Sequence, residues 1–337
     1  MARILLTQAI HPRAEARLAE LGELSVAADT APETLRTAAA GCAVVVVRAP
    51  LPADIFDAVP SLVGAVRHGA GVDMIPLAEA SAHGVLVANV PGVNANAVAE
   101  HVVRSLLQLA RRTPVVAAVL AGGRSATWAR ARALADGGFE LRGRCVGVVG
   151  HGHVGQAIAR ICGQGLGMRV LAHSRSPLAS DALAQSASLD DLLAASDFVV
   201  LACPLTDATR GLVGAAQLAR MKPGAFLVNV ARGPVVDEAA LVEALRAGRL
   251  VGAALDVFDT QPLPDAHPFW DMPQVILTPH VAGLTEDSMV AMGLQAAVAV
   301  EHLLRGEVPP HCINPEAATT FAARFSAASD SPAPGTA

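Results

Sequence analysis

One segment of the sequence carries three glycines in a spacing that suits a dinucleotide. An apolar run ends at Val149 and leads directly into a G-x-G-x-x-G turn, after which a helix-compatible run begins. The first glycine allows a tight turn, the second lets the backbone approach a pyrophosphate, and the third lets the helix pack on the strand. An ordinary strand–turn–helix is the simpler alternative. The residues predicted to hold the cofactor here are Gly150, Gly152, His153, Val154 and Gly155.

The end of the next predicted strand indicates which cofactor is bound. About 20 residues after the glycines, an NAD site usually carries an acidic side chain for the ribose 2′-hydroxyl. Here Ser174 stands 19 residues after Gly155, and Arg175 follows it. Without a carboxylate a 2′-phosphate is not repelled, and Arg175 can bind that phosphate. We expect NADP(H), with NAD(H) as the alternative if Arg175 is merely a solvated arginine.

Two further side chains are candidates for binding an anion and for donating a proton. Arg232 directly follows a predicted strand at 225–230, and open α/β sheets bind ligands at the carboxyl ends of their strands. Its planar guanidinium matches a carboxylate. His280 stands between Pro279 and Val281. With an ordinary pKa of about 6.5, it can donate a proton near neutral pH.

The elements that must position these residues alternate along the chain as in a parallel α/β protein. Short apolar runs predict strands at 4–6, 43–47, 62–66, 86–88, Cys145–Val149, Arg169–His173, Phe198–Leu201, 225–230, 252–256 and Val275–Leu277. Helix-compatible segments lie at 13–21, 32–40, 52–58, 76–83, 97–112 and 287–305, and others are expected between most of the later strands. The text after about Pro315 is rich in Ser, Ala and Pro, so we expect a disordered tail.

Composition excludes several classes of protein. A chain of 337 residues is long enough for about two domains. The net charge of −5 argues against a nucleic-acid partner, and a 53% hydrophobic content excludes general disorder. Five scattered cysteines without C-x-x-C spacing predict reduced thiols in the cytoplasm and no metal site. We expect a first strand and not a signal peptide at the start of the chain. Asparagines and a proline break the longest uncharged stretch, 80–99, so no membrane partner is expected.

Read together, the glycine turn and five other ordered motifs resemble those of the D-isomer-specific 2-hydroxyacid dehydrogenases. The resemblance extends to about Pro315. Besides the glycine turn, the matching segments are RHGAGVDMIPLAEASAHGVLVANVPGVNANAVAEHVV (67–103), CPLTDATRGL (203–212), MKPGAFLVNVARGPVVDEAALVEAL (221–245), GAALDVF (252–258) and LTPHVAG (277–283).

The resemblance implies an α/β fold of two doubly wound parallel-sheet domains, with the active site in the cleft between them. A cofactor domain of the Rossmann type is inserted into a flavodoxin-like substrate domain. The expected boundaries are 1–98 for the first part of the substrate domain, 99–283 for the cofactor domain, 284–315 for the C-terminal return and 316–337 for the tail. Members of the family are usually homodimers.

The resemblance also assigns roles to residues. Arg232 corresponds to the arginine that grips the carboxylate and carbonyl of the substrate, and His280 to the acid/base histidine. Asp256 matches a residue that helps hold the nicotinamide carboxamide, although it could simply cap a strand. Further cofactor contacts are implied for Pro204, Thr209 and Ala231.

A loop in the first domain matches the segment whose backbone amides hold the substrate carboxylate. Glycines let main-chain N–H groups converge on an anion. Arg48 and Arg67 resemble basic positions of the phosphoglycerate-dehydrogenase branch and could receive a second acidic group, a question that the sequence leaves open. The residues of the loop are His68, Gly69, Ala70 and Gly71.

One position departs from the usual pattern of the family. Dehydrogenases place a Glu before Pro to orient and charge the histidine, but Gln261 stands there, 29 residues after Arg232. Glutamine can orient His280 by a hydrogen bond, yet it cannot stabilise an imidazolium by charge. We therefore predict a lower pKa for His280 than in members with Glu, and reduction favoured at acidic pH.

Three functions are consistent with these residues. The first is an NADPH-dependent reductase of a small 2-oxo acid such as glyoxylate or hydroxypyruvate, with catalytic Arg232, Gln261 and His280. The second is a formate dehydrogenase-like hydride transfer, because those enzymes share the Gln–Pro pair, and Gln261 precedes His280 by the same 19 residues. The third is a non-catalytic, nucleotide-sensing corepressor-like dimer, since such proteins retain the catalytic residues.

Overall fold

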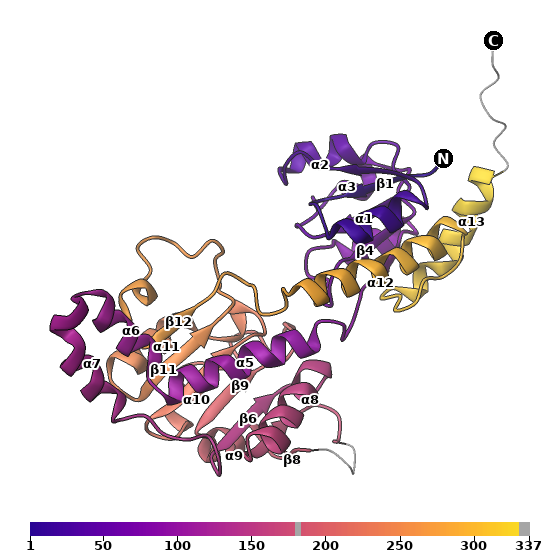
Figure 1. The fold of residues 1–337 in the computed structure, drawn as a ribbon. Coiled ribbons are helices and arrows are strands. Elements are labelled where there is room, and N and C mark those ends of the chain that lie inside the picture. The colour runs from indigo at the N-terminus through magenta and orange to yellow at the C-terminus, as the bar shows by residue number, and fades with distance from the viewer. Residues whose placement is uncertain (179–182, 330–337) are drawn as a thin grey trace. The chain divides into compact units, whose positions relative to one another are not determined.

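The protein, described here by a computed structural model, divides into two compact units, each built on one parallel sheet (Figure 1). The structure describes residues 1–178 and 183–329. The first unit comprises Met1–Asn94 together with Thr285–Ala337, and the second comprises Ala95–Leu284. The predicted α/β class with two parallel sheets is confirmed. No helix among the described residues is long and apolar enough to cross a membrane.

The first unit has a five-stranded sheet in the order β2-β1-β3-β4-β5, which is the flavodoxin-like order. Its strands are β1 (Arg3–Leu6), β2 (Glu23–Val26), β3 (Val44–Val47), β4 (Gly64–Arg67) and β5 (Leu86–Ala88). Its helices are α1 (Pro12–Ala19), α2 (Pro32–Ala39), α3 (Ile55–Ala58), α4 (Leu77–Ala82), α12 (Glu286–Leu304) and α13 (Ala318–Ser329).

Both faces of this sheet are buried, as a parallel sheet requires. In β3 all four residues are valines and all are buried. Val44 and Val46 pack with side chains of α1 and α12, whereas Val45 and Val47 pack with those of α2 and α3. The unbroken apolar run of this strand therefore follows from having a helix layer on each side.

The prediction of a disordered tail from 316 onward is wrong for most of its length. A short 3-10 turn at Pro315–Ala317 leads into α13, and Phe321 is only 1% exposed. Arg324 donates to the carbonyls of Pro60 and Leu62, 2.7 and 2.9 Å away. The small and polar residues of this segment concealed three anchors: Phe321 and Phe325, which pack on the core, and Arg324, which donates several hydrogen bonds. Residues 330–337 lie outside the described part of the chain.

The second unit has a seven-stranded sheet in the order β12-β11-β10-β9-β6-β7-β8. Its strands are β6 (Cys145–Val149), β7 (Arg169–His173), β8 (Gln185–Ser186), β9 (Phe198–Leu201), β10 (Ala225–Asn229), β11 (Leu250–Leu255) and β12 (Val275–Leu277). Its helices are α5 (Ala95–Ala110), α6 (Thr113–Ala121), α7 (Trp128–Ala135), α8 (His153–Arg160), α9 (Leu189–Ala195), α10 (Ala215–Arg220) and α11 (Glu238–Arg246). Strand order reverses between β6 and β9, where doubly wound sheets bind ligands.

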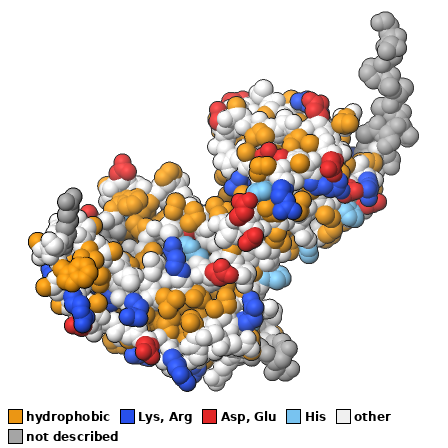
Figure 2. Space-filling model, in the orientation of Figure 1, with side chains coloured by type: hydrophobic (Ala, Val, Ile, Leu, Met, Phe, Trp, Pro, Cys, Tyr) orange, Lys and Arg blue, Asp and Glu red, His pale blue; other side chains and the backbone are white. Residues whose placement is uncertain are grey.

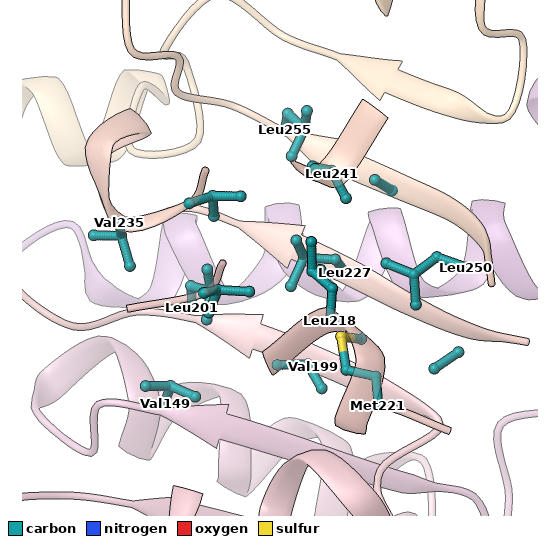
Figure 3. Close-up of a cluster of buried hydrophobic side chains, with 14 of the residues drawn as sticks. Val149, Val199, Leu201, Leu218, Met221, Leu227, Val235, Leu241, Leu250 and Leu255 are labelled. Atoms are coloured by element: carbon teal, nitrogen blue, oxygen red, sulfur yellow. The ribbon is translucent and has the colours of Figure 1, made fainter. Parts of the chain in front are cut away.

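Helices cover both faces of this sheet as well. Helices α5 and α8 pack on one face, and α9, α10 and α11 pack on the other. Figure 3 shows part of the hydrophobic cluster on the face covered by α9, α10 and α11. There Val199 and Leu227, from neighbouring strands, meet Leu218 and Met221. Because helices bury both faces of the sheet, polar side chains can be exposed at the carboxyl ends of its strands.

Besides α13, four elements escaped the sequence analysis. Strands β2 and β8 contain half-buried and exposed residues, so they lack the apolar signal of the central strands. Beyond Pro114, where the long helix was predicted to stop, α6 and α7 continue the chain. Pro114 lies in the first turn of α6, a position that proline favours.

Candidate active site

The glycine turn has the geometry of a dinucleotide cradle. Gly150 has a φ of 99°, and a Cβ there would lie 2.7 Å from the Cys203 nitrogen. A Cβ on Gly155 would lie 2.1 Å from the Gly150 carbonyl oxygen, so only glycine allows α8 to begin so close to β6. At Gly152, the N-cap of α8, a Cβ would meet nothing within 4 Å. The open space at a helix N-terminus fits a pyrophosphate.

The side chains of this turn differ in exposure. His153 is exposed at the start of α8, and Val154 is half-buried. His151 is half-buried, and its Nδ1 is buried without a hydrogen-bond partner in the described part of the chain. Burial lowers the pKa of His151, so this imidazole is neutral near pH 7.

Two loops of this unit hold four more of the predicted nucleotide contacts, Ser174, Arg175, Pro204 and Thr209. Ser174, half-buried, and Arg175, exposed, directly follow β7, the neighbour of β6 in the sheet. In the loop after β9, Thr209 donates from Oγ1 to the Pro204 carbonyl at 2.7 Å and accepts from the Thr206 amide at 2.8 Å. The hydroxyl of Thr209 therefore shapes its own loop.

A buried amide positions Arg232. Asn229, the last residue of β10, is 1% exposed. Its Oδ1 accepts from the Ala231 amide at 3.0 Å, and its Nδ2 donates to the Arg232 carbonyl at 3.0 Å. Asn229 thus clamps both ends of the turn on which Arg232 stands. Sequence reasoning missed Asn229, although a polar residue ending the apolar run Ala-Phe-Leu-Val was a usable signal.

Asp256 holds the loop that carries His280. The carboxylate, on a side chain only 2% exposed, accepts from Thr278 Oγ1 at 2.6 Å and from the amides of Val281 and Ala282, each at 2.9 Å. The amide of His280 donates to the Asp256 carbonyl at 2.8 Å. His280 is exposed and has a φ of 57°, a left-handed conformation that is uncommon outside glycine.

The loop that carries Gln261 is held by an acid–histidine pair that sequence reasoning also missed. Glu238, at the start of α11, accepts from the Asp259 amide at 2.7 Å and lies 3.4 Å from Nε2 of His267. The ring of His267 contacts Phe269, with centroids 4.4 Å apart. Gln261 is exposed and donates from Nε2 to the Phe258 carbonyl at 3.3 Å. Orientation of His280 by Gln261 therefore stays a prediction.

In the first unit, the loop after β4 presents free amides. Among the described residues, no acceptor takes a hydrogen bond from the N–H of Ala70 or Gly71. Arg67 holds this loop from below: Nε donates to the Gly71 carbonyl at 3.0 Å, and Nη1 donates to the carbonyls of Val47 and His68 at 2.8 and 2.9 Å. These bonds give Arg67 a structural task at the base of a concave, anion-compatible loop.

His68 is the first residue of that loop, and Arg48 lies near enough for its charge to act on His68. His68 is 4% exposed, and burial, together with the charges of Arg48 and Arg67, lowers its pKa to about 4. The buried imidazole lies near Gly293 of α12 and, being neutral near pH 7, cannot act as a cation. Arg48 is half-buried and donates from Nη1 to the Ala9 carbonyl.

The second unit thus brings most of the predicted residues to one edge of one sheet. The glycine turn, Ser174, Arg232, Asp256 and His280 follow β6, β7, β10, β11 and β12, whose carboxyl ends share that edge because the sheet is parallel. The amides of 69–71 belong to the first unit. No cluster of three or more His, Cys, Asp or Glu that could hold a metal ion occurs among the described residues.

Comparisons with known proteins agree with this arrangement. The sequence model for the NAD-binding domain of D-isomer-specific 2-hydroxyacid dehydrogenases matches residues 103–282. A glyoxylate reductase of Korarchaeum cryptofilum is 34% identical over 323 residues, which cover 93% of this chain and 96% of the relative. A D-3-phosphoglycerate dehydrogenase of Mycobacterium tuberculosis is 39% identical over 78% of this chain, and the match spans 49% of that longer protein.

A solved structure shares the fold of nearly the whole chain. The NADPH-dependent glyoxylate/hydroxypyruvate reductase of Sinorhizobium meliloti, in complex with NADP and malonate, has a TM-score of 0.80 and 32% identity to this chain. That similarity covers 93% of this chain and 96% of the reductase. The chain belongs to the D-isomer-specific 2-hydroxyacid dehydrogenase family.

Proposed function

We propose that this protein is an NAD(P)H-dependent reductase of a small 2-oxo acid of the glyoxylate or hydroxypyruvate type, forming the D-2-hydroxy acid. One observation carries the proposal. A cationic fork, Arg232, and a proton donor, His280, stand on loops pinned by the buried side chains of Asn229 and Asp256. Relatives named for reduction of these oxo acids support the substrate class.

Each residue has one task in this proposal. The nicotinamide, when bound, supplies the hydride to the carbonyl carbon. Arg232 holds the carboxylate and the carbonyl oxygen through parallel N–H groups. His280 gives its proton to the carbonyl oxygen as negative charge develops there, which completes the alcohol. Asp256 already accepts three hydrogen bonds, and a carboxylate has about four acceptor sites, so one remains for the carboxamide of the nicotinamide.

Roles in substrate binding are proposed for the loop after β4 as well. The free amides of Ala70 and Gly71 suit a carboxylate, and Gly69 keeps the loop compact. The pKa of His68 places this side chain in its neutral form near pH 7, so it supports the loop without charge. For a second acidic group on the substrate, Arg48 is the better candidate, because Arg67 donates to three backbone carbonyls.

Replacing the proton donor tests the reaction. We expect His280→Asn to lower kcat for glyoxylate or hydroxypyruvate reduction by roughly 10²–10⁴-fold, the usual loss when a general acid is removed. The matched control is His311→Asn, at an exposed histidine whose φ of 55° equals that of His280 within a few degrees. Steady-state oxidation of NADPH and NADH measures both variants. Equal losses in the two variants would contradict the assignment.

The same assay separates the alternatives. Gln261 favours formate as a second candidate substrate, because hydride transfer from formate needs no proton donor. If the wild-type protein oxidises formate and turns over no 2-oxo acid, the formate dehydrogenase-like function would be established. Tight binding of the cofactor without turnover of any of these acids would favour a nucleotide sensor.

For the cofactor we propose NADP(H), because Arg175 is exposed directly after β7 and Ser174 removes the usual carboxylate. We expect Arg175→Ala to weaken NADPH binding about tenfold, the size of one charge-assisted hydrogen bond, and to leave NADH binding unchanged. Titration calorimetry with each cofactor measures both constants, with Arg13→Ala at an exposed arginine of the first unit as control. Tighter binding of NADH by the wild type would refute the preference.

The glutamine at position 261 has a consequence for pH dependence. A carboxylate there would favour the imidazolium form of His280, so Gln261→Glu keeps the proton donor charged at higher pH. We expect the pH–rate profile of oxo-acid reduction to extend by about one unit toward alkaline pH. Gln185→Glu, at an exposed site on β8, is the control. A profile that matches the wild type would show that residue 261 does not act on His280.

We also propose a homodimer that pairs through α6 and α7. Helix α6 is strongly apolar, yet none of its residues is fully buried, and Trp128 at the start of α7 is 65% exposed. Hydrophobic side chains gather on the surface over these helices (Figure 2). Because exposed tryptophans are frequent anchors of interfaces, Trp128→Glu should raise the dimer dissociation constant at least tenfold in sedimentation equilibrium. A wild-type monomer at micromolar concentration would refute the dimer.

A cytoplasmic location is proposed from the cysteines. All five are free thiols, and burial raises the pKa of Cys162 to about 12, which keeps it unreactive. The small net charge gives no support to a nucleic-acid partner. Recovery of the protein outside the cytoplasm after cell fractionation would contradict the location.

A further inference from the structure

A line of polar contacts runs from helix α5 to the loop that carries His280. His101, half-buried on α5, places Nε2 at 3.4 Å from Oγ1 of Thr278. Thr278 donates in turn to the carboxylate of Asp256, which accepts the amides on the far side of His280. All members of this line belong to the second unit.

The protons that each group can donate fix the direction of every hydrogen bond in this line. The hydroxyl of Thr278 has one proton, and the contact of 2.6 Å with Asp256 uses it, because a carboxylate can only accept. The Thr278 oxygen is therefore left to accept from His101. Nε2 of His101 must then carry the ring proton, which fixes one tautomer of the imidazole.

Burial of His101 favours that neutral ring. Burial lowers its pKa, Asp256 raises it, and Arg104 on the same helix lowers it, with a net shift downward. The ring is consequently neutral near pH 7 and has a single proton to place. The line of contacts needs that proton on Nε2.

The backbone conformation of His280 depends on Asp256, the residue at the other end of this line of contacts. Its left-handed backbone is held by its own amide, which donates to the carbonyls of Asp256 and Thr278 at 2.8 and 3.1 Å. The two following amides bind the Asp256 carboxylate. If the Thr278 hydroxyl rotates away from Asp256, the carboxylate loses its shortest contact and the loop is held less firmly.

We propose that His101 is a positioning residue for His280, acting through the Thr278 hydroxyl and the Asp256 carboxylate. Its Nε2–H keeps the Thr278 proton aimed at Asp256, and Asp256 keeps residues 280–282 in place. The kinetic part of this inference rests on the proposed role of His280. The structural part, one fixed tautomer and one firmly held loop, does not.

Three variants test the kinetic part. We expect His101→Leu to lower kcat for oxo-acid reduction about tenfold with little change in KM, as for other residues that orient a functional group through a partner. His101→Gln should retain most of the activity, because its side-chain NH₂ can replace the Nε2 donor. Ser105→Ala, one turn further along α5, is the control: Ser105 is buried and donates only to the His101 carbonyl. Equal kcat values in the Leu and Ala variants would overturn the proposal.

Two further measurements need no turnover. In ¹⁵N NMR of histidine-labelled wild-type protein, the His101 signal, assigned by its loss in His101→Gln, should show the proton on Nε2. Hydrogen exchange of the peptide that covers 278–282 should be faster in His101→Leu than in His101→Gln. A proton on Nδ1, or equal exchange in the two variants, would overturn the inference. Absence of any 2-oxo acid turnover in the wild type would instead refute the proposed function alone.

Discussion

A carboxylate that is withdrawn from water must find hydrogen-bond donors in the protein, and Asp256 finds its donors in one short loop. Two backbone amides and one hydroxyl of residues 278–282 satisfy it. Because the same residue also accepts the His280 amide through its carbonyl, the loop cannot move without exposing a buried charge. The location of the exposed imidazole is therefore decided by a side chain that need never touch the substrate.

The parallel sheet explains why the remaining groups gather with it. Helices bury both faces of the sheet, so polar side chains can reach solvent only where strands end. All carboxyl ends share one edge, and the glycine turn after β6 and the Arg232 turn after β10 lie on that edge. Asn229 holds the turn of Arg232 by hydrogen bonds, as Asp256 holds the loop of His280. The turn of half-buried Arg232 and the loop of exposed His280 are thus each held by a buried polar side chain.

Sequence patterns were sufficient for much of this description. Continuous apolar runs identified the central strands, and the spacing of Gly150, Gly152 and Gly155 identified the turn, since no other residue avoids the 2.1 Å approach at position 155. The same patterns failed where burial is partial. Strands β2 and β8 and helices α6 and α7 have no fully apolar face turned to a core. The tail was misjudged because Phe321, Arg324 and Phe325 are its few anchors among small and polar residues.

The sequence by itself determined the two parallel sheets and the glycine turn, because these follow from periodicity and local steric limits. The roles expected of Arg232 and His280 came instead from a resemblance to a family. Only the tertiary structure decided what each polar group is bonded to. Arg67 was open to a role in substrate binding, yet its guanidinium holds three backbone carbonyls. His101 drew no attention, yet it lies beside Thr278, 177 residues away along the chain. Hydrogen bonds between distant segments depend on the folded path of the chain, which local patterns do not encode.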